Sequence, residues 1–266
     1  MHTWHWRTWS GLPYLTCSIL DPWFHGFFTR QFSPRSPEEL TQVLQSAAQI
    51  YRVKQVHGNI VLSPSEIRRE QGEQGEKSLS PLATALAQAD GLITEEPEQA
   101  VWVASADCTP VLLADSKTGQ VAAIHAGWRG TALKIVPQAI ARLLAQGSQI
   151  QDLRIALGPA IAGEVYQVST MVASQVGASI LPQEAQSLLD ALQQLPNSPV
   201  LPDPHLERVR LDIRRVIALQ LEQLGVSPEQ VAIAPHCTYQ EPEYFFSYRR
   251  DQLKKVQWSG IVSKSD

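Results

Sequence analysis

The sequence contains no apolar run that approaches the roughly 18–20 residues needed to cross a bilayer. Its first residues mix tryptophans with polar groups, whereas a secretory signal peptide needs a continuous apolar stretch. Cysteine is also scarce, because only Cys17, Cys108 and Cys237 are present, far apart and odd in number. This usage is typical of a reduced chain rather than a disulfide framework. We therefore expect a cytoplasmic protein with no membrane partner.

Charged residues are few, and they show no basic excess. The 22 Lys and Arg residues against 26 Asp and Glu residues give a formal net charge of −4, and charged residues make up 18% of the chain. Nucleic-acid-binding proteins usually carry a basic excess that neutralises phosphates, so we expect no nucleic-acid partner. A hydrophobic fraction of 44% supports a packed interior and argues against disorder.

The length and the absence of repeats favour one domain that spans residues 1–266, since domains average about 150 residues. Two polar stretches interrupt the pattern. Residues 67–80 combine glycine with charge, and residues 195–204 contain four prolines. We interpret both as loops inserted within a domain rather than as domain boundaries.

Short apolar runs predict strands in the middle of the chain, at Val101–Ser105, Pro110–Ala114, Gln120–His125, Leu153–Leu157 and Val231–Ala234. Only a short turn separates the second run from the third, so these two are predicted to form an antiparallel hairpin.

Apolar residues at intervals of three and four predict helices at Pro137–Leu144, Thr170–Ile180, Gln183–Leu195 and His205–Leu224. Proline cannot occupy the middle of a regular helix, so the first of these helices is expected to begin near Pro137 or to kink there. Strands and helices do not alternate in a steady βαβα rhythm. The predicted fold class is therefore α/β with mixed β-sheets layered with helices.

Three segments place a reactive side chain beside a turn where a predicted strand ends, and such positions commonly carry functional groups. They are Lys54–Gly58, Ala106–Pro110 and Ile124–Gly130. Cys108 is the most informative residue of these segments. A free cysteine is most often a buried structural thiol, but the neighbouring Asp107 and Thr109 create a polar turn that packing alone does not need. The predicted hairpin brings Cys108 close to His125.

Two chemistries use a cysteine beside histidine. A thiolate can act as a nucleophile with His125 as its base. Alternatively, Cys108, His125 and His57 can supply three ligands to a zinc ion and leave a fourth position open. The three residues lack the short spacing of a strong metal motif. If they do bind one ion, we expect their side-chain atoms to come within roughly 4–5 Å of a common point.

A candidate anion site follows His125. Gly127 and Gly130 flank Trp128 and Arg129 immediately before a helical pattern resumes. Glycine allows close backbone approach, a helix start presents free N–H groups, and arginine offers a fork of donors to phosphate. The alternative is a tight turn with a surface arginine.

Alternating aromatics predict a strand at Tyr244–Asp251, in which Phe246 and Tyr248 share one face and Arg249 points to the other. Such a strand could stack a flat base, although core aromatics with solvated arginines would give the same pattern. Arg30, which ends an aromatic segment, is a further cationic candidate. The residues predicted to bind substrate or phosphate are Arg30, Gln55, Arg129, Phe246, Tyr248 and Arg249.

Taken together, these segments resemble the YfiH family, also called the laccase-domain or multicopper polyphenol oxidoreductase family and described as purine nucleoside phosphorylases. The matching motifs cover nearly the whole chain in the family's order: HGFFTR (25–30), QVHG (55–58), ADGLIT (89–94), SADCTPVLLAD (105–115), AAIHAGWRGT (122–131), LGPAIAGEVYQV (157–168) and PHCTY…YFFSYRRD (235–251).

The resemblance implies a single domain of mixed sheets with a cysteine-hydrolase-like fold. It also implies a zinc ion, with copper as the other possible metal, held by His57, Cys108 and His125. The implied activities are phosphorolysis of adenosine, inosine and methylthioadenosine, with adenosine deamination. The implied partners are purine nucleosides and phosphate, and we expect a monomer or a small homo-oligomer.

The chain departs from the family pattern in two places. Residues 31–36 are shorter than the corresponding family segment, and residues 254–260 replace a Thr-Gly-Arg turn. We expect both segments at the rim of the pocket, where they would affect substrate preference.

Three other functions compete with nucleoside phosphorolysis. A cysteine hydrolase or peptidoglycan-editing factor would use Cys108 as nucleophile and His125 as base. Copper-dependent polyphenol oxidation is the weaker alternative, because several copper centres need many histidines and the chain has seven. A metal-binding interaction module without enzymatic activity is the fourth possibility.

Overall fold

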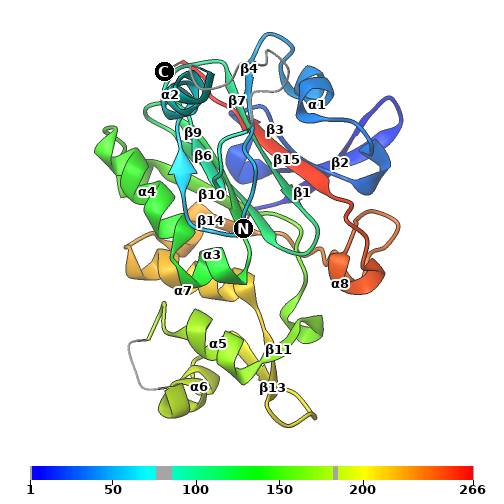
Figure 1. Cartoon of the computed structure of the whole chain (residues 1–266), viewed down its shortest axis with the longest axis vertical. Helices are drawn as coiled ribbons and strands as arrows, with labels where there is room; N and C mark the ends of the chain where they lie inside the picture. The colour runs from blue at the N-terminus through cyan, green and yellow to red at the C-terminus, as the bar shows by residue number, and fades with distance from the viewer. Residues whose placement is uncertain (1, 76–85, 182–184, 266) are drawn as a thin grey trace.

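The computed structural model describes residues 2–75, 86–181 and 185–265, and it shows two six-stranded mixed sheets with a smaller three-stranded sheet (Figure 1). In spatial order, the first sheet contains β1 (Trp4–Trp9), β2 (Leu12–Cys17), β3 (His25–Phe28), β15 (Gln257–Val262), β7 (Gln99–Ser105) and β4 (Gln49–Tyr51). The second contains β14 (Val231–Ile233), β10 (Leu153–Leu157), β8 (Thr109–Asp115), β9 (Val121–Ala126), β6 (Gly91–Ile93) and β5 (Val61–Leu62). The third contains β11 (Gln167–Ser169), β13 (Arg208–Leu211) and β12 (Val200–Pro202).

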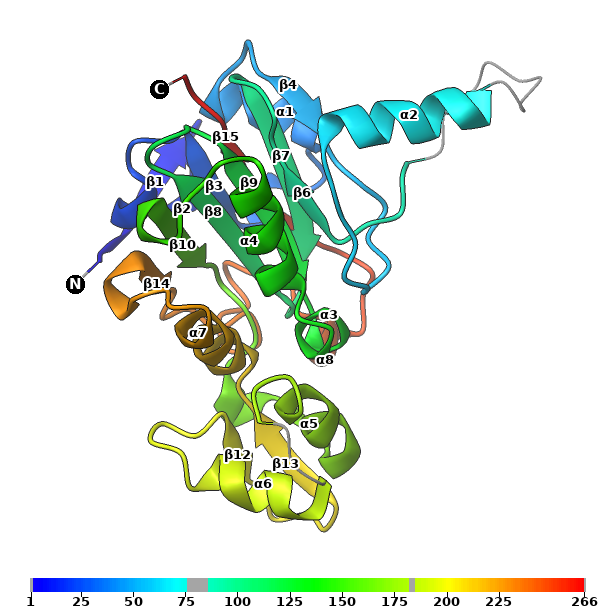
Figure 2. The ribbon, with the colours of Figure 1, turned by 90° about the vertical axis from the view of Figure 1, so that its left-hand side faces the viewer.

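The chain also forms helices, some of which cover the outer faces of the two large sheets. They are α1 (Pro37–Leu44), α2 (Pro64–Gly75), α3 (Trp128–Ala132), α4 (Ile135–Ala145), α5 (Thr170–Gly177), α6 (Ala185–Gln193), α7 (Ile213–Gln223) and α8 (Tyr248–Asp251). The third sheet lies with α5 and α6 at one end of the molecule, while α2 projects from the other end (Figure 2). No helix in the described ranges is long and apolar enough to span a membrane.

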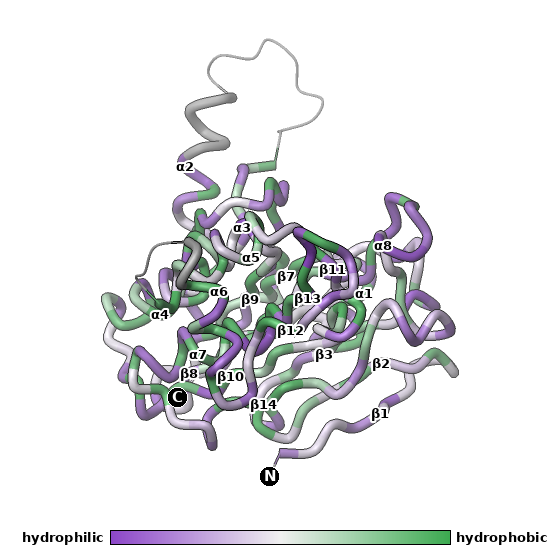
Figure 3. The backbone as a smooth tube through the Cα atoms, turned by 90° about the horizontal axis from the view of Figure 1, so that it is seen from below, coloured by the Kyte–Doolittle hydropathy of each residue, from purple (hydrophilic) through white to green (hydrophobic). Residues whose placement is uncertain are grey.

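Three layers of buried apolar side chains hold these elements together. One lies between the two large sheets and includes Phe27, Val103 and Leu112. A second packs α4 and α7 against the other face of the second sheet, and a third packs α1 against the outer face of the first. The strands β7 and β9 lie in the hydrophobic centre of the molecule (Figure 3). The predicted α/β class with mixed sheets is confirmed.

The predicted hairpin forms as β8 and β9. Thr109 pairs with Ala126 and Pro110 pairs with His125, in antiparallel register. The turn at the far end is held by Asp115, whose Oδ1 accepts the backbone N–H groups of Lys117 at 2.7 Å and Thr118 at 3.0 Å. The other predicted strands are confirmed as β7, β10 and β14.

The predicted helices are confirmed as α4, α5 and α6, apart from residues 183–184, which lie outside the described residues. The helix predicted at His205–Leu224 is wrong over its first half. That half forms β13, and α7 begins only at Ile213. The side chain of Asp212 accepts the backbone N–H of Arg215 at 3.1 Å, so it caps the helix and fixes its start.

Two predicted loops contain regular structure. Within residues 67–80, helix α2 extends to Gly75, and residues 76–80 lie outside the described part of the chain. Its first turn is fixed because Glu66 accepts the backbone N–H of Ser63 at 2.7 Å and pairs with Arg142. Residues 195–204 include the short strand β12, which pairs with β13.

The strand predicted at Tyr244–Asp251 is also wrong. The chain turns there, and Tyr248–Asp251 form the short helix α8. The side chain of Ser247 accepts the backbone N–H of Arg250 at 3.2 Å and caps this helix. Phe246 is buried, whereas Tyr248 is half exposed, so the two aromatics do not share one face.

Candidate active site

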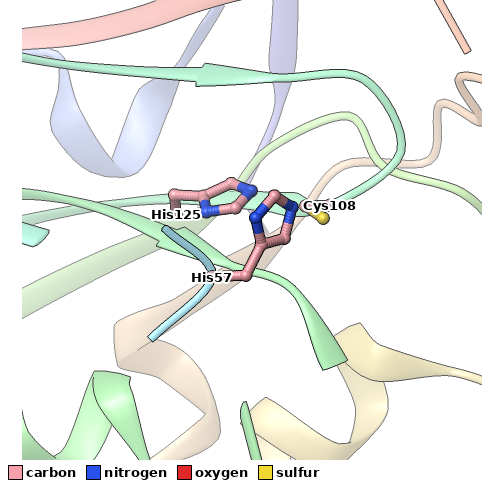
Figure 4. Close-up of side chains that lie close together, drawn as sticks. All are labelled: His57, Cys108 and His125. Carbon is pink, nitrogen blue, oxygen red and sulfur yellow. The ribbon is translucent and has the colours of Figure 1, made fainter. Parts of the chain in front are cut away.

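His57, Cys108 and His125 meet at one place, as the sequence predicted (Figure 4). One ligand atom from each side chain lies within 4.8 Å of the others. The two imidazole rings are nearly perpendicular, at 86°, with their centroids 4.8 Å apart. His125 is buried, Cys108 is partly buried and His57 is exposed, so the cluster lies at the surface end of the core.

The cluster forms where the chain passes from the first sheet to the second. His57 lies on the segment between β4 and β5, and Cys108 lies on the turn between β7 and β8. His125 is on β9, directly opposite Pro110. Because both crossing segments end at the same edge of the two sheets, side chains from distant parts of the sequence converge there.

The backbone of both crossing segments adopts a left-handed conformation beside the cluster. His57 has a φ of 61° and Asp107 has a φ of 97°. Such values are uncommon for residues with side chains and are found at sites where surrounding contacts hold the strain. The neighbouring contacts of these two residues therefore determine where His57 and Cys108 point.

Asp90 holds the His57 segment and His125 together. Its carboxylate accepts backbone N–H groups from Val56 at 3.2 Å, His57 at 2.9 Å and Gly58 at 2.7 Å. The same carboxylate lies 2.9 Å from Nδ1 of His125. An acceptor at Nδ1 leaves Nε2 of His125 free to face Cys108 or a metal ion. The side chain of Asp90 has no exposed surface.

Asp107 holds the Cys108 turn in a similar way. Its Oδ1 accepts the hydroxyl of Thr238 at 2.7 Å, and its Oδ2 accepts the backbone N–H of Arg249 at 2.7 Å. Its carbonyl oxygen accepts the N–H of Ile161 at 3.0 Å. Three separate segments therefore fix the residue that precedes Cys108.

The cluster is strongly polarised. Burial would raise the pKa of the Cys108 thiol, but His125 and His57 lower that pKa to about 6. Burial would lower the pKa of His125, but the Cys108 thiolate and Asp90 raise it to about 9. Burial also opposes ionisation of Asp90, yet its hydrogen bonds to His125 and the His57 segment keep its pKa below the usual value. In the metal-free protein the geometry therefore favours a thiolate beside an imidazolium.

Gly127 lets the chain after β9 approach the cysteine. A Cβ atom at this position would lie 2.9 Å from Sγ of Cys108 and 3.4 Å from Cδ2 of His57. Gly127 also precedes the first residue of α3. Only a residue without a side chain fits this close approach.

The donor set fits a metal ion. Thiolate and imidazole are both zinc ligands, and three protein ligands are typical of catalytic zinc sites that keep a fourth position open. The carboxylate of Asp90 on the second nitrogen of His125 is the outer contact that usually orients such a ligand. In the described part of the chain, this is the one group of three or more such side chains close enough to bind an ion together.

A cavity of about 380 Å³ opens beside the cluster. Its volume falls within the usual range of small-molecule sites, about 300–1,000 Å³. Most of its lining is apolar, and the cluster supplies several of its polar groups. The lining residues are Val53, Gln55, His57, Ala104, Ser105, Ala106, Cys108, His125, Tyr248, Leu253, Lys254, Lys255, Val256 and Trp258.

The structure places the other predicted binding residues in different environments. Gln55 and Tyr248 line the cavity. The amide of Gln55 is also paired with the backbone of Ala104, since it donates to the carbonyl at 2.8 Å and accepts the N–H at 2.7 Å. Arg30 and Phe246 lie outside the cavity lining. The Arg30 guanidinium stacks on the Phe246 ring at 4.6 Å and donates to the carbonyl of Pro242 at 2.7 Å.

Arg249 lies against Tyr166, a residue that the sequence analysis missed, whereas Arg129 lies against Trp128. The Arg249 guanidinium lies 4.9 Å above the Tyr166 ring, and the Arg129 guanidinium lies 4.3 Å above the ring of Trp128. Burial and the negative charges of Cys108 and Asp107 raise the pKa of Tyr166 to about 12, whereas the two arginines act in the opposite direction. The charges of both arginines and of Cys108 therefore act on Tyr166.

The sequence indicated Asp90 and Tyr166 in one way only, as members of motifs. Both belong to motifs quoted above, in ADGLIT and LGPAIAGEVYQV. Neither motif indicates a spatial partner, and the two residues join the site only through contacts between segments far apart in the chain.

Comparison with known proteins identifies relatives across the whole chain. Residues 35–262 match the family model for multi-copper polyphenol oxidoreductase laccase. A purine nucleoside phosphorylase of Synechocystis sp. is 53% identical over 98% of this chain and 97% of its own length. The purine nucleoside phosphorylase YlmD of Bacillus subtilis is 30% identical over 80% of this chain and 69% of its own. The adenosine deaminase RL5, of unknown prokaryotic origin, is 30% identical over 68% of this chain and 64% of its own.

Solved structures share the fold. YlmD of Geobacillus stearothermophilus matches with a TM-score of 0.79, at 23% identity, over 98% of this chain and 99% of its own. YfiH of Bacillus licheniformis matches with a TM-score of 0.74, at 23% identity, over 97% and 99% of the two chains.

Proposed function

The chain belongs to the multi-copper polyphenol oxidoreductase laccase family, and from that membership we propose that it is a metal-dependent purine nucleoside phosphorylase with adenosine deaminase activity. The proposed substrates are adenosine, inosine and methylthioadenosine, with inorganic phosphate as the second substrate. The names of the relatives support nucleoside chemistry, and one of them is named as an adenosine deaminase.

The observation that carries this proposal is the position of the cluster. His57, Cys108 and His125 lie in the wall of a cavity large enough for a nucleoside. An aromatic ring from Tyr248 and the indole of Trp258 line the same cavity. The flat aromatic surfaces suit a purine base, and the neighbouring cluster of His57, Cys108 and His125 suits the sugar at which the reaction occurs.

His57, Cys108 and His125 would hold the metal, with Asp90 orienting His125 from behind. A zinc ion bound there would act as a Lewis acid and increase the acidity of a water molecule. We favour zinc over copper because a copper site of the His₂Cys type usually has an axial methionine, and no methionine lines this cavity.

In phosphorolysis, phosphate adds to the sugar carbon while the purine leaves with its bonding electrons. The enzyme must hold the phosphate and stabilise positive charge on the ribose. We assign phosphate binding to Arg129, assisted by Arg249. Neither arginine lines the cavity, but the charges of both arginines and of Cys108 act on Tyr166, and the Arg249 guanidinium lies 4.9 Å from the centre of the Tyr166 ring.

Product analysis with adenosine, in the presence and absence of phosphate, tests this function. We expect free adenine and ribose 1-phosphate when phosphate is present, and inosine when it is absent. If neither reaction occurs in metal-loaded protein, the proposal is wrong.

Arg129→Ala tests the assignment of phosphate binding. Loss of a charge-assisted hydrogen bond, worth about 1.5–3 kcal/mol, should raise the KM for phosphate about 10- to 100-fold. Deamination, which uses no phosphate, should change less. Arg154→Ala is the control, because Arg154 lies on β10 opposite Ala114, remote from the cluster. Equal loss of both activities would leave Arg129 with a structural role.

A cysteine hydrolase is the second candidate, and one observation favours it. Asp90, His125 and Cys108 form a carboxylate–imidazole–thiol series in which the thiol pKa is lowered. Hydrolysis of an amide or cell-wall substrate by metal-free protein, with a covalent adduct at Cys108, would support this alternative, including a role in peptidoglycan editing.

A further inference from the structure

A second cavity, of about 230 Å³, lies beside the first. Two segments form most of its wall. One lies between β3 and α1, and the other lies between α8 and β15. These are the two places where the sequence departs from the family pattern. The lining residues are Phe28, Thr29, Phe32, Ser33, Pro34, Arg35, Leu40, Lys254, Lys255, Val256, Gln257 and Trp258.

The lining of this second cavity carries three positive charges and no carboxylate. The cations are Arg35, Lys254 and Lys255. Among the described residues, none of their side chains forms an ion pair or a hydrogen bond. The Arg35 guanidinium lies 5.7 Å from the centre of the Trp9 ring and 5.9 Å from that of Phe32, so two aromatic rings lie beside it. No carboxylate in the lining therefore balances these three cations.

The two cavities share a wall. Lys254, Lys255, Val256 and Trp258 line both of them. The second cavity is smaller than the usual small-molecule site of about 300–1,000 Å³. Its size therefore suits one substituent or a small ion rather than a whole nucleoside.

We infer that the second cavity is an anion subsite that binds a phosphate group, with Arg35 as its principal ligand. The planar fork of arginine pairs with two phosphate oxygens, and the lysines add point charges. The phosphate can be the 5′-phosphate of a nucleotide whose nucleoside part lies in the first cavity, which rests on the proposed function. It can also be free inorganic phosphate. The nucleotide phosphate and free phosphate would be bound by the same contacts with Arg35 and the two lysines.

Isothermal titration of the metal-loaded protein in phosphate-free buffer tests the subsite. Inosine and inosine 5′-monophosphate are the matched probes, because inosine is not phosphorolysed without phosphate. We expect the monophosphate to bind at least tenfold more tightly than inosine, a difference of about 1.4 kcal/mol. Arg35→Gln should reduce this ratio below threefold without weakening inosine binding, and Arg35→Lys should restore part of it. Lys117→Gln, which alters an exposed lysine in the β8–β9 turn, should leave the ratio unchanged.

Titration with inorganic phosphate separates the two sources. It is carried out in an Arg129→Ala background, which removes the phosphate ligand assigned to the reaction. Phosphate binding that disappears when Arg35→Gln is added supports the subsite and identifies free phosphate as its ligand. If neither the nucleotide preference nor phosphate binding depends on Arg35, the inference is overturned. If inosine fails to bind, the proposed function is in error, while the phosphate titration still decides the subsite.

Discussion

Asp90 contacts both histidine-bearing segments of the cluster although it is not one of the three candidate ligands. Its carboxylate accepts three backbone N–H groups around His57 and faces Nδ1 of His125. Charge-assisted hydrogen bonds of this kind are stronger than neutral ones. One buried side chain therefore holds the backbone of one candidate ligand and the ring orientation of another.

Asp90→Asn should weaken metal binding about 10- to 100-fold, because the amide accepts hydrogen bonds less strongly and leaves Nδ1 of His125 without its carboxylate. The measurement is a competition titration with a metal chelator. Asp115→Asn is the matched control, since Asp115 is also buried and accepts backbone N–H groups, but in the distant hairpin turn. Equal affinities in the two variants would contradict this role for Asp90.

The metal-free protein should show an unusually reactive cysteine. Neighbouring imidazoles lower the pKa of Cys108 from 9.0 to about 6, so its thiolate is lost only as the pH falls through about 6. His125, raised from 6.5 to about 9, loses its proton as the pH rises through about 9. The charged pair, and the stability that it contributes, should therefore persist between these two values.

Alkylation with iodoacetamide over a pH series measures this reactivity. Modification of Cys108 should reach half its maximal rate near pH 6. Cys17 is the internal control, because burial raises the pKa of its thiol to about 11. A half-maximal rate near pH 9 for Cys108 would show that the histidines do not act on its thiol.

The candidate ligands themselves could be predicted at the residue scale. The hairpin pattern around residues 110–125 was enough to predict that Cys108 lies near His125. His57 was added as a candidate ligand because it lies beside a turn and because the family resemblance implies it. Asp90 could not be placed in the same way, because it lies 33 positions from His57 and 35 from His125. Contacts over such separations depend on how the sheets stack, which no local pattern encodes.

At the scale of elements, the short turns decide how closely the segments approach one another. The turn after β9 packs directly on the turn between β7 and β8, and Gly127 is the point of contact. Its φ of −77° is ordinary for any residue, so only the lack of a side chain matters there.

Gly127→Ala should displace Cys108 and lower metal affinity without unfolding the protein, since the added Cβ would lie 2.9 Å from Sγ. Gly58→Ala is the matched control. Its Cβ would lie at an ordinary 3.6 Å from Asp90 Oδ2. Metal affinity and the free energy of unfolding are measured for both variants. Unchanged affinity in Gly127→Ala would show that the turn tolerates a side chain.

Elements with strong local signals could be predicted, and elements with conflicting signals could not. The short apolar runs that form β8, β9 and β10 predicted strands clearly. The segment at Tyr244–Asp251 alternates like a strand, but the capping contact of Ser247 makes it a helical turn. At His205–Leu224, the apolar spacing of three and four continued across the boundary that Asp212 sets between β13 and α7.

At the scale of the whole molecule, the site depends on the stacking of two sheets. Both segments that bring His57 and Cys108 to the site cross from one sheet to the other. The apolar layer between the sheets fixes their spacing and thereby the distance between these segments. The mixed α/β class could be predicted from the sequence, whereas the pairing order of the strands could not, because β4 and β15 join β7 from opposite ends of the chain.

Above all, we propose that His57, Cys108 and His125 together hold one metal ion that nucleoside turnover requires. The most direct test measures metal content and adenosine turnover on the same preparations of the wild-type protein and Cys108→Ser. We expect about one metal ion per chain with phosphate-dependent turnover in the wild type, and loss of most of both in the variant. A Cys108→Ser protein that keeps its metal and its full turnover would contradict the account.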